Sequence, residues 1–332
     1  LAQKSSKKIF CQSAIIVLMS EIKMYDLIII GAGPAGITAG VYAARKRLKT
    51  LILTQDIGGQ MAWSSDVENY PGFSMISGGD LVEKFESHIE QFRDVLELRL
   101  TSKGVTSIEK NKTYFSVKSG DGGSEHARAV IIAGGRKPKE LGIKGEKEFL
   151  NRGVSYCAWC DGPIFRNKDI AIIGGGNSAL DTAINIQRSV KSIVIVNVTK
   201  ELLGDKILIE KVTNAQNIRI LNNTEVTSIN GDKFVSSITI KPVDKDNTED
   251  LSLSGVFIEI GSIPATDYLK DMLKLNSNGE IIIDKKNMSS AEGLFAAGDI
   301  TDIEEKQIVT AAGEGAKAAI MASKYIARFL DQ

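Results

Sequence analysis

The amino-acid sequence predicts an α/β fold with two Rossmann-like dinucleotide-binding domains, the second inserted in the first. Two glycine motifs carry this prediction, because each follows a buried apolar strand, one near residue 31 and the other near residue 174. A third observation is that buried apolar runs resume near residue 294, after the second motif. We therefore expect a flexible N-terminal arm at 1–23, a first domain made of 24–136 and 264–332, and an inserted domain at 137–263.

The composition is that of an ordinary globular protein. The chain has 332 residues, of which 43% are apolar, enough for about two domains with real cores. Lys plus Arg and Asp plus Glu both number 41, so no net charge favours nucleic acid or an anionic membrane as a partner. We expect a cytoplasmic protein.

The first 23 residues differ from the rest of the chain. Lysines precede a short apolar run at 14–19, which faintly resembles a signal peptide. The run is shorter than a membrane span, and no convincing small-residue cleavage site follows it. Because the chain opens on Leu, with Met19 and Met24 just ahead of the first strand, it suggests a translation start upstream. We expect this arm to be mobile.

The first glycine motif completes a dinucleotide-binding unit. An apolar strand at 25–30 runs into Gly31, Gly33 and Gly36, and a helix at 37–45 and a strand at 50–53 follow. Glycines at this spacing let the backbone approach a pyrophosphate at the N-terminus of the helix. The acidic residue expected after the second strand is replaced by Thr54, so ribose recognition must differ from the simplest pattern.

Loops and strands fill the rest of the first domain. Segments 58–60 and 67–72 combine glycine with amide side chains, which suits contact with a flat polar ring, although ordinary turns share this composition. We expect a helix at 80–92, strands at 97–100, 105–110 and 114–118, and a buried closing run at 129–135.

The second glycine motif has the G-x-G-x-x-A form. A strand at 170–173 precedes it, and a helix to about 187 and a strand at 192–196 follow. The candidate residues of this second nucleotide site are Gly174, Gly176, Asn177, Ser178 and Ala179. Residues 197–203 would select between the nicotinamide dinucleotides, because arginines bind the 2′-phosphate of NADPH and a carboxylate binds the free 2′-hydroxyl of NADH. This segment has no arginine and no acid at the strand end, so the site departs from the usual pattern.

The remainder of the chain continues the second domain and returns to the first. A polar run at 244–250 predicts a hairpin tip, and 261–265 predicts the return linker. Asp299 follows a buried run and a glycine, where it could bind a ribityl hydroxyl or simply cap a turn. The other elements we expect are strands at 218–222, 225–230, 236–242 and 255–260, and a final helix at 307–330.

Cys157 and Cys160 are separated by two residues, so they can close a small disulfide ring with little strain. The alternative for such a pair is half of a zinc site, which needs two more ligands. The other candidates, Cys11, His88 and His126, are distant in sequence, so we expect no metal. The sequence therefore predicts a redox-active disulfide, which suits a reducing compartment.

From residue 25 onward the sequence resembles the low-molecular-weight thioredoxin reductases, which pass electrons from a pyridine nucleotide through FAD and a disulfide to thioredoxin. The order and spacing of seven segments carry the resemblance. They are GAGPAG (31–36), GGQ (58–60), ENYPG (68–72), CAWCDG (157–162), GGGNSA (174–179), GLFAAGDI (293–300) and QIVTAAGEG (307–315).

The resemblance implies FAD as the cofactor and a role for each matching residue. Cys157 would attack the substrate disulfide, Cys160 would exchange electrons with the flavin, and Asp161 would donate a proton. A helix or turn cap is the alternative for Asp161. Gly31, Gly33 and Gly36 would hold the FAD pyrophosphate, and Gln60 and Asn69 would lie near the flavin. Asp299 would bind the ribityl chain, and Gln307 and Ile308 would lie at the pyrimidine edge of the ring. The other residues of the expected FAD site are Pro34, Ala35, Gly59 and Gly298.

One segment departs from the family. Members that use NADPH carry His-Arg-Arg-x-x-x-Arg after the second strand of the inserted domain, where this chain has Asn197, Val198, Thr199 and Leu203. Each arginine–phosphate contact is worth about 1.5–3 kcal/mol, so NADPH should bind poorly. No carboxylate favours NADH instead. Some relatives of the family without these motifs take electrons from ferredoxin or another donor.

The leading hypothesis is a flavin-dependent reductase of a thioredoxin or glutaredoxin-like protein, as a homodimer, whose electron donor stays open and need not be NADPH. A conventional NADPH enzyme that recognises the 2′-phosphate through Lys200 or Lys206 is one alternative. A flavin thiol oxidase that passes electrons to oxygen is another, and a redox sensor without catalysis a third. Because one disulfide must reach both flavin and substrate, we expect the inserted domain to rotate on linkers near 134–138 and 261–265.

Overall fold

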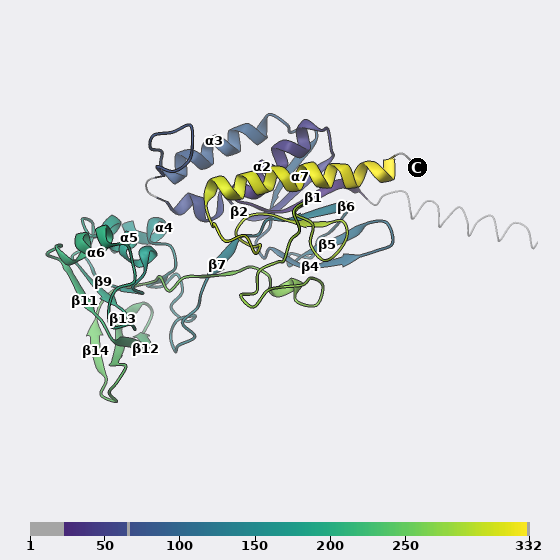
Figure 1. The fold of residues 1–332 in the computed structure, drawn as a ribbon. Coiled ribbons are helices and arrows are strands. Elements are labelled where there is room, and N and C mark those ends of the chain that lie inside the picture. Colours follow the sequence, from purple (N-terminus) through teal and green to yellow (C-terminus); the bar gives the residue numbers. More distant parts are fainter. Residues whose placement is uncertain (1–22, 65–66, 331–332) are drawn as a thin grey trace, which may run out of the picture. The chain divides into compact units, whose positions relative to one another are not determined.

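The computed structural model describes residues 23–64 and 67–330 of the chain, without the side chains of Trp63, Trp159, Cys160 and Leu330. Within this part the chain divides into two compact units (Figure 1). The first unit holds residues up to 59, 82–135 and 266 onward, and the second holds 60–81 and 136–265. The predicted arm at 1–23 lies outside the described residues except for Lys23.

A mixed sheet forms the centre of the first unit, and its strand order is β3-β2-β1-β6-β5-β4. Strands β3, β2, β1 and β6 run parallel, β17 adds a parallel pairing to β6, and the β4–β5 hairpin joins β6 antiparallel. The bounds are β1 Met24–Ala32, β2 Thr50–Ile57, β3 Leu96–Leu100, β4 Val105–Lys110, β5 Phe115–Ser119, β6 Ser124–Ile132 and β17 Leu294–Ala296.

Strand β1 has apolar side chains on both faces, as expected for a buried parallel strand. Leu27 and Ile29 belong to the core under helices α2 and α7, whereas Ile28 and Ile30 belong to the core on the opposite face. The helical elements of this unit are α2 Pro34–Arg45, α3 Gly78–Glu90, η3 Asp267–Leu269 and α7 Ile308–Leu330, although α3 begins in residues assigned to the second unit.

The second unit repeats this plan with a parallel sheet of order β11-β10-β9-β15-β8. An antiparallel sheet of order β12-β13-β14 follows β11 in the chain. The strands are β8 Val154–Ser155, β9 Asp169–Ile173, β10 Ser192–Val196, β11 Ile218–Leu221, β12 Thr224–Gly231, β13 Val235–Pro242, β14 Glu249–Ser252 and β15 Gly255–Ile258. The helical elements are η1 Gly59–Trp63, α4 Ala158–Asp161, η2 Gly162–Phe165, α5 Asn177–Ile186 and α6 Lys206–Thr213.

The two predicted linkers pair with each other. Strands β7, Arg136–Pro138, and β16, Ser262–Pro264, form an antiparallel ribbon in the second unit. The Arg136 guanidinium tightens this ribbon, since it donates from Nε to Ser262 Oγ (3.0 Å) and from Nη2 to Ser262 O (2.7 Å).

The predicted fold class is confirmed, because two parallel α/β units are present and all strands of the second sheet lie between β6 and β17 in the chain. Three local features were not predicted. Strand β14 begins at Glu249 inside the expected hairpin tip, helix α6 follows the second glycine unit, and α4 begins directly after Cys157. The domain boundaries derived from the sequence stay a proposal.

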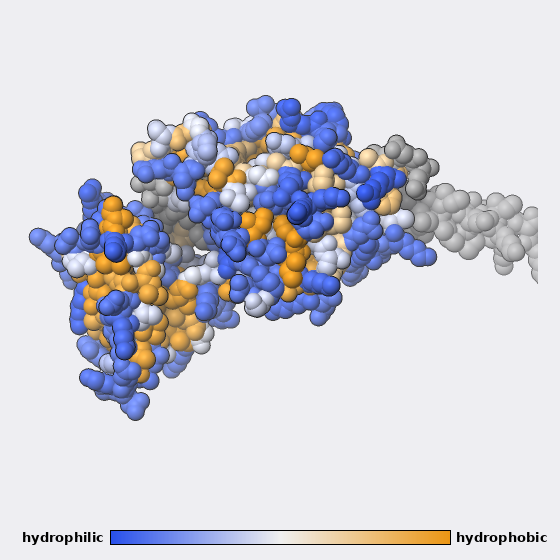
Figure 2. Space-filling view, viewed as in Figure 1, coloured by the Kyte–Doolittle hydropathy of each residue, from blue (hydrophilic) through white to orange (hydrophobic). Residues whose placement is uncertain are grey.

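Some apolar side chains remain at the surface. Figure 2 shows apolar patches on the exposed face of the second unit, bordered by hydrophilic residues. The large apolar residues that this unit exposes include Ile164, Val198, Leu203, Ile207 and Phe234. In the described part of the chain no helix combines the length and the apolar character needed to cross a membrane.

The core under β9 gives a first prediction. Ile172 is fully buried between the sheet and α5, so Ile172→Ala should lower the free energy of unfolding by about 2–5 kcal/mol, because it leaves a cavity. Ile207→Ala, on α6 with 61% of the residue exposed, should change it by less than about 0.5 kcal/mol. Urea denaturation followed by circular dichroism measures both, and equal effects would contradict this packing.

Candidate functional site

The first glycine turn brings the backbone of β1 and α2 into close contact. Gly31 has a φ of +102°, and a Cβ added there would lie 2.3 Å from the carbonyl oxygen of Ala133. A Cβ on Gly36 would lie 1.9 Å from the carbonyl oxygen of Gly31. Only glycine therefore fits at either position. A Cβ on Gly33 would lie 3.8 Å from the carbonyl oxygen of Gly58, so this residue is less crowded.

Other predicted residues of the first unit gather at the same turn. A Cβ on Gly298 would lie 3.0 Å from the Ala35 Cβ, and one on Gly59 would lie 3.6 Å from the Gly33 Cα. Pro34 begins α2, where a proline is favoured because the first helical N–H needs no partner. Asp299 follows Gly298 after β17, and Gln307 and Ile308 stand at the start of α7. Of the C-terminal candidates, the structure thus brings Gly298 to the glycine motif, and the roles of the others stay a prediction.

Thr54 replaces the acid that the motif leads one to expect, and the structure gives it another role. Its buried hydroxyl accepts a hydrogen bond from the Ala32 N–H (3.1 Å) and donates one to the Asp56 carbonyl oxygen (2.6 Å). Thr54 therefore fixes the backbone of the glycine turn itself, at Ala32 between Gly31 and Gly33. Thr54 lies within β2, three residues before the strand ends at Ile57, and nothing in the sequence signalled this role.

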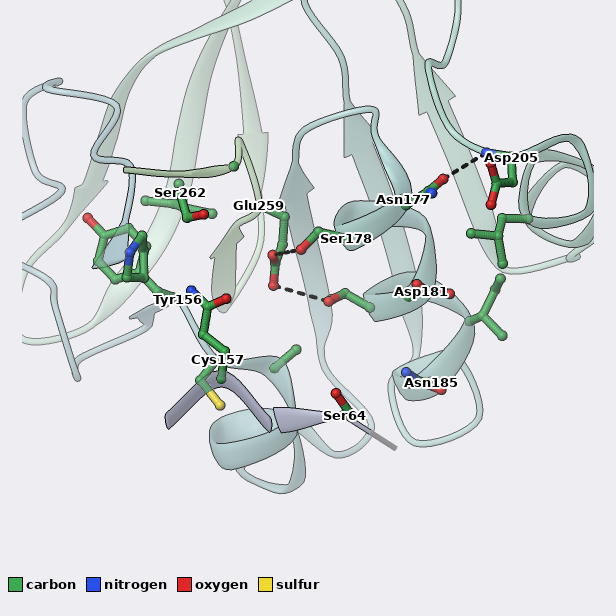
Figure 3. A pocket seen from close by; sticks show the side chains of 18 of the residues that line it. Ser64, Tyr156, Cys157, Asn177, Ser178, Asp181, Asn185, Asp205, Glu259 and Ser262 are labelled. Carbon is green, nitrogen blue, oxygen red and sulfur yellow. Dashed lines mark hydrogen bonds between the residues drawn. The ribbon is translucent and has the colours of Figure 1, made fainter. Parts of the chain in front are cut away.

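A cleft of about 940 Å³ lies in the second unit (Figure 3). Cys157 lines it together with residues of α5, and Gln60 and Asn69, which were predicted to lie near a ring, also line it. The amide of Gln60 donates to the carbonyl oxygen of Arg136 (3.1 Å).

The predicted redox pair lies between β8 and η2. Cys157 is disulfide-bonded, and its N–H donates to Ser155 Oγ (3.0 Å). Its carbonyl oxygen accepts a hydrogen bond from the Asp161 N–H (3.1 Å). Cys160 belongs to α4, but its side chain is not among those that the structure describes, so its pairing with Cys157 stays a prediction.

Asp161 ends α4 and precedes η2. Among the described residues its side chain makes no capping hydrogen bond to η2. The geometry therefore does not support the alternative that Asp161 caps η2. Its assignment as proton donor stays a proposal.

Tyr156 is held beside Cys157 by a buried carboxylate that the sequence did not reveal. Glu146 is 1% exposed and accepts hydrogen bonds from the N–H groups of Leu141 (2.8 Å) and Gly142 (2.7 Å). It also accepts one from the Tyr156 hydroxyl (2.7 Å). Burial raises the pKa of Tyr156, and the Glu146 carboxylate raises it further, so the phenol stays protonated and keeps this bond.

The second glycine turn is as crowded as the first. A Cβ on Gly174 would lie 2.2 Å from the carbonyl oxygen of Glu259, and one on Gly175 would lie 2.4 Å from Asn197 Oδ1. Gly176 precedes α5, and an added Cβ there would meet no atom within 4 Å among the described residues. Asn177 and Ser178 open α5, and Ala179 is buried beneath the turn.

The loop after β10 folds back onto this turn. Asn197 is 3% exposed, and its amide donates to the carbonyl oxygens of Thr199 (3.1 Å) and Glu201 (3.0 Å) and to Asn222 Oδ1 (2.9 Å). The Leu203 N–H donates to the Gly175 carbonyl oxygen (2.7 Å). The side chain of Asn177, a predicted site residue, also takes part in this structure, because its Oδ1 accepts a hydrogen bond from the Asp205 N–H (2.7 Å).

Negative charge predominates in the cleft. Its lining contains the carboxylates of Glu68, Asp181, Asp205 and Glu259, and Lys211 is the one Lys or Arg among its described residues. Burial raises the pKa of Asp181, and the neighbouring Asp205 raises it further. Within residues 23–64 and 67–330, no group of three or more His, Cys, Asp or Glu side chains could hold a metal ion.

Comparison with known proteins adds to this geometry. The family model for pyridine nucleotide-disulphide oxidoreductases matches residues 25–315. One component of the alkyl hydroperoxide reductase of Staphylococcus aureus is 38% identical over 304 residues, which are 92% of this chain and 59% of that protein. The chain thus spans less than two thirds of the length of this relative.

Several solved structures resemble the chain, and two of them bear on its function. Thioredoxin reductase of Lactococcus lactis, in its FR conformation, is 35% identical with a TM-score of 0.82, over 92% of this chain and 99% of that one. A ferredoxin-flavin thioredoxin reductase of Clostridium acetobutylicum is 27% identical with a TM-score of 0.53, over 93% of this chain and 100% of that one.

The anchoring of the loop after β10 can be tested. Asn197→Ala should lower the free energy of unfolding by about 1–3 kcal/mol, because buried carbonyl groups lose their donor. Val198→Ala, at a residue with 57% exposure, is the matched control and should have little effect. Thermal unfolding of both variants measures the difference, and a neutral Asn197→Ala would rule out this anchor.

Proposed function

The chain belongs to the pyridine nucleotide-disulphide oxidoreductase family and, within it, to the low-molecular-weight thioredoxin reductases, and on this premise we propose that it reduces a disulfide in a thioredoxin or glutaredoxin-like protein. It is a thioredoxin reductase-like flavin disulfide oxidoreductase. The observation that carries the proposal is a disulfide-bonded Cys157 on the wall of a cleft. The proposed donor is not NADPH.

FAD is the cofactor of this family, and the first unit fits it. The backbone has no room for a Cβ at Gly31 or Gly36, and Gly298 lies against Ala35. This arrangement lets a pyrophosphate approach the N-terminus of α2 closely. When bound, FAD supplies the two-electron carrier between the donor and the protein disulfide. The residues of the first unit proposed to hold it are Gly31, Gly33, Pro34, Ala35, Gly36, Gly59, Gly298, Asp299, Gln307 and Ile308.

The proposed exchange uses the reduced pair. The Cys157 thiolate attacks the substrate disulfide, a bond forms between Cys157 and one substrate sulfur, and the other substrate sulfur leaves as a thiolate. The Cys160 thiolate then attacks Cys157, which restores the Cys157–Cys160 disulfide and releases the substrate as a dithiol. Asp161 provides a proton to a leaving thiolate. Two electrons thus pass from the pair to the substrate.

The choice of donor rests on the second unit. Val198, Thr199 and Leu203 stand where family members that use NADPH carry arginines. The amide of the neighbouring Asn197 already donates hydrogen bonds within the protein. Three lost arginine–phosphate contacts, each worth about 1.5–3 kcal/mol, remove most of the affinity for a 2′-phosphate. The Clostridium acetobutylicum relative is a ferredoxin-flavin thioredoxin reductase, and we propose ferredoxin or a similar donor for this chain as well.

A conventional NADPH reductase is the second candidate. Lys211 lines the cleft, where its ammonium could meet a phosphate, and this observation is the one that favours it. Three carboxylates of the same unit, Asp181, Asp205 and Glu259, oppose that contact. We further propose a homodimer in the cytoplasm, where thiols stay reduced.

The cysteine pair can be tested with a matched variant. Cys160→Ser should leave FAD bound and lower turnover of a protein disulfide by at least about 100-fold, because the resolving thiol is lost. Cys11→Ser, the same substitution outside the pair, should retain full turnover. Reduction of oxidised thioredoxin by dithionite-reduced protein, followed through released thiols, measures this. Retained turnover in Cys160→Ser would refute the proposal.

The FAD site gives a separate prediction. Gly36→Ala should cost about 1–3 kcal/mol in local stability, because its Cβ meets the Gly31 carbonyl oxygen, and most of the bound flavin should be lost. Gly79→Ala, whose Cβ would meet nothing closer than 3.9 Å among the described residues, is the control and should keep its flavin. The ratio of flavin absorbance to protein absorbance measures the bound flavin. A Gly36→Ala protein that keeps its flavin would contradict the assignment of this turn to the FAD site.

A further inference from the structure

Glu259 has an unusual place in the second unit. It follows β15, and its N–H donates to the Ile173 carbonyl oxygen (2.8 Å), so its backbone is fixed at the edge where β9 ends. The same backbone closes over the second glycine turn, since a Cβ on Gly174 would lie 2.2 Å from the Glu259 carbonyl oxygen. The residue is half-buried and lines the cleft.

The carboxylate of Glu259 is bound to the first half of α5 (Figure 3). It accepts a hydrogen bond from the Ser178 hydroxyl and another from Thr182 Oγ1 (3.1 Å). Ser178 and Thr182 are four residues apart, so both hydroxyls lie on one face of the helix. A negative charge therefore lies beside the N-terminal turn of α5, where a dinucleotide unit places the pyrophosphate of its ligand.

The Glu259 carboxylate has only uncharged hydrogen-bond partners among the described residues. Among the described residues no Lys or Arg forms a salt bridge with it, and its hydrogen-bond partners Ser178 and Thr182 are uncharged hydroxyls. Burial raises the pKa of Glu259, and the hydrogen bonds from Ser178 and Thr182 lower it in part. A second anion close to the carboxylate would meet repulsion in a partly desolvated place.

The missing arginines and the Glu259 carboxylate act on different parts of a dinucleotide. The arginines of NADPH-dependent relatives contact the 2′-phosphate, which NADH lacks, so their absence does not explain why NADH should bind poorly. A carboxylate beside the turn acts on the diphosphate, which NADH and NADPH share. The two features are therefore independent.

We propose that Glu259 is a specificity-determining residue that keeps the diphosphate of a pyridine dinucleotide away from the second glycine turn. This inference rests on the proposed function, in which the donor is not a pyridine nucleotide. The alternative is that Glu259 only ties β15 to α5. The two roles differ in their dependence on charge. A glutamine amide has the size of the carboxylate and can still bond both hydroxyls, accepting one hydrogen bond and donating the other, but it carries no charge.

Calorimetric titration of the flavin-loaded protein with NADH and with ADP-ribose tests the proposal. The variants are Glu259→Gln, whose amide can accept one of the two hydroxyl hydrogen bonds and donate the other, and Glu259→Ala, which removes the side chain. Both should bind each probe about tenfold more tightly or better than the wild type. Flavin content and thermal midpoint should stay unchanged in Glu259→Gln, which shows that the unit is intact.

Two controls separate position from net charge. Glu249→Gln changes the same charge on exposed β14, outside the cleft lining, and should leave both affinities unchanged. Asp181→Asn removes another carboxylate of the cleft, one that does not accept the Ser178 and Thr182 hydrogen bonds, and should have less effect than Glu259→Gln. Equal tightening by Asp181→Asn would overturn the assignment to Glu259.

The remaining outcomes are distinguishable. If the wild type binds neither probe and both Glu259 variants bind no better, the inference about Glu259 fails while the proposed donor stands. If the wild type binds NADH or NADPH tightly, the proposed donor fails, and the exclusion by Glu259 fails with it.

Discussion

Both units depend on a backbone contact that excludes a side chain. In the first unit, α2 begins so close to β1 that Gly36 has no room for a Cβ beside the Gly31 carbonyl oxygen. In the second unit, a Cβ on Gly174 would meet the Glu259 carbonyl oxygen, and one on Gly175 would meet the side chain of Asn197. This contact lets a helix N-terminus face the carboxyl edge of a parallel sheet, where α/β folds bind their ligands. The cofactor site and the cleft both follow from it.

The two turns have diverged in chemistry although their geometry is shared. Around the first turn the structure gathers small residues, Ala35, Gly59 and Gly298, which leave a backbone cradle for an anion. Around the second turn the polar groups are already used by the protein, because Asn177 binds Asp205 and Ser178 binds Glu259. We propose on this basis that one site keeps its dinucleotide while the other has lost its ligand, since function belongs to the site and not to the fold.

Much of this architecture could be predicted from the sequence, because glycine spacing and apolar strands are local signals. The residues that were missed act through contacts distant in sequence. Glu259 accepts a hydrogen bond from Ser178, which is 81 positions away in the sequence, and no local pattern near either residue predicts that contact. Glu146 is an ordinary acid in the sequence until the fold buries it against Tyr156. The segment after β10 was recognised as a departure from the family, but the hydrogen bonds that occupy Asn197 needed the structure.

We propose above all that electrons do not enter through a pyridine nucleotide in the second unit. An anaerobic titration of the flavin-loaded protein with NADPH, then NADH, then reduced ferredoxin, followed by flavin absorbance, tests this most directly. We expect that neither nucleotide bleaches the flavin at near-stoichiometric amounts and that reduced ferredoxin does. Rapid bleaching by NADPH would contradict the proposal and would identify a conventional reductase whose phosphate contacts differ from those of its relatives.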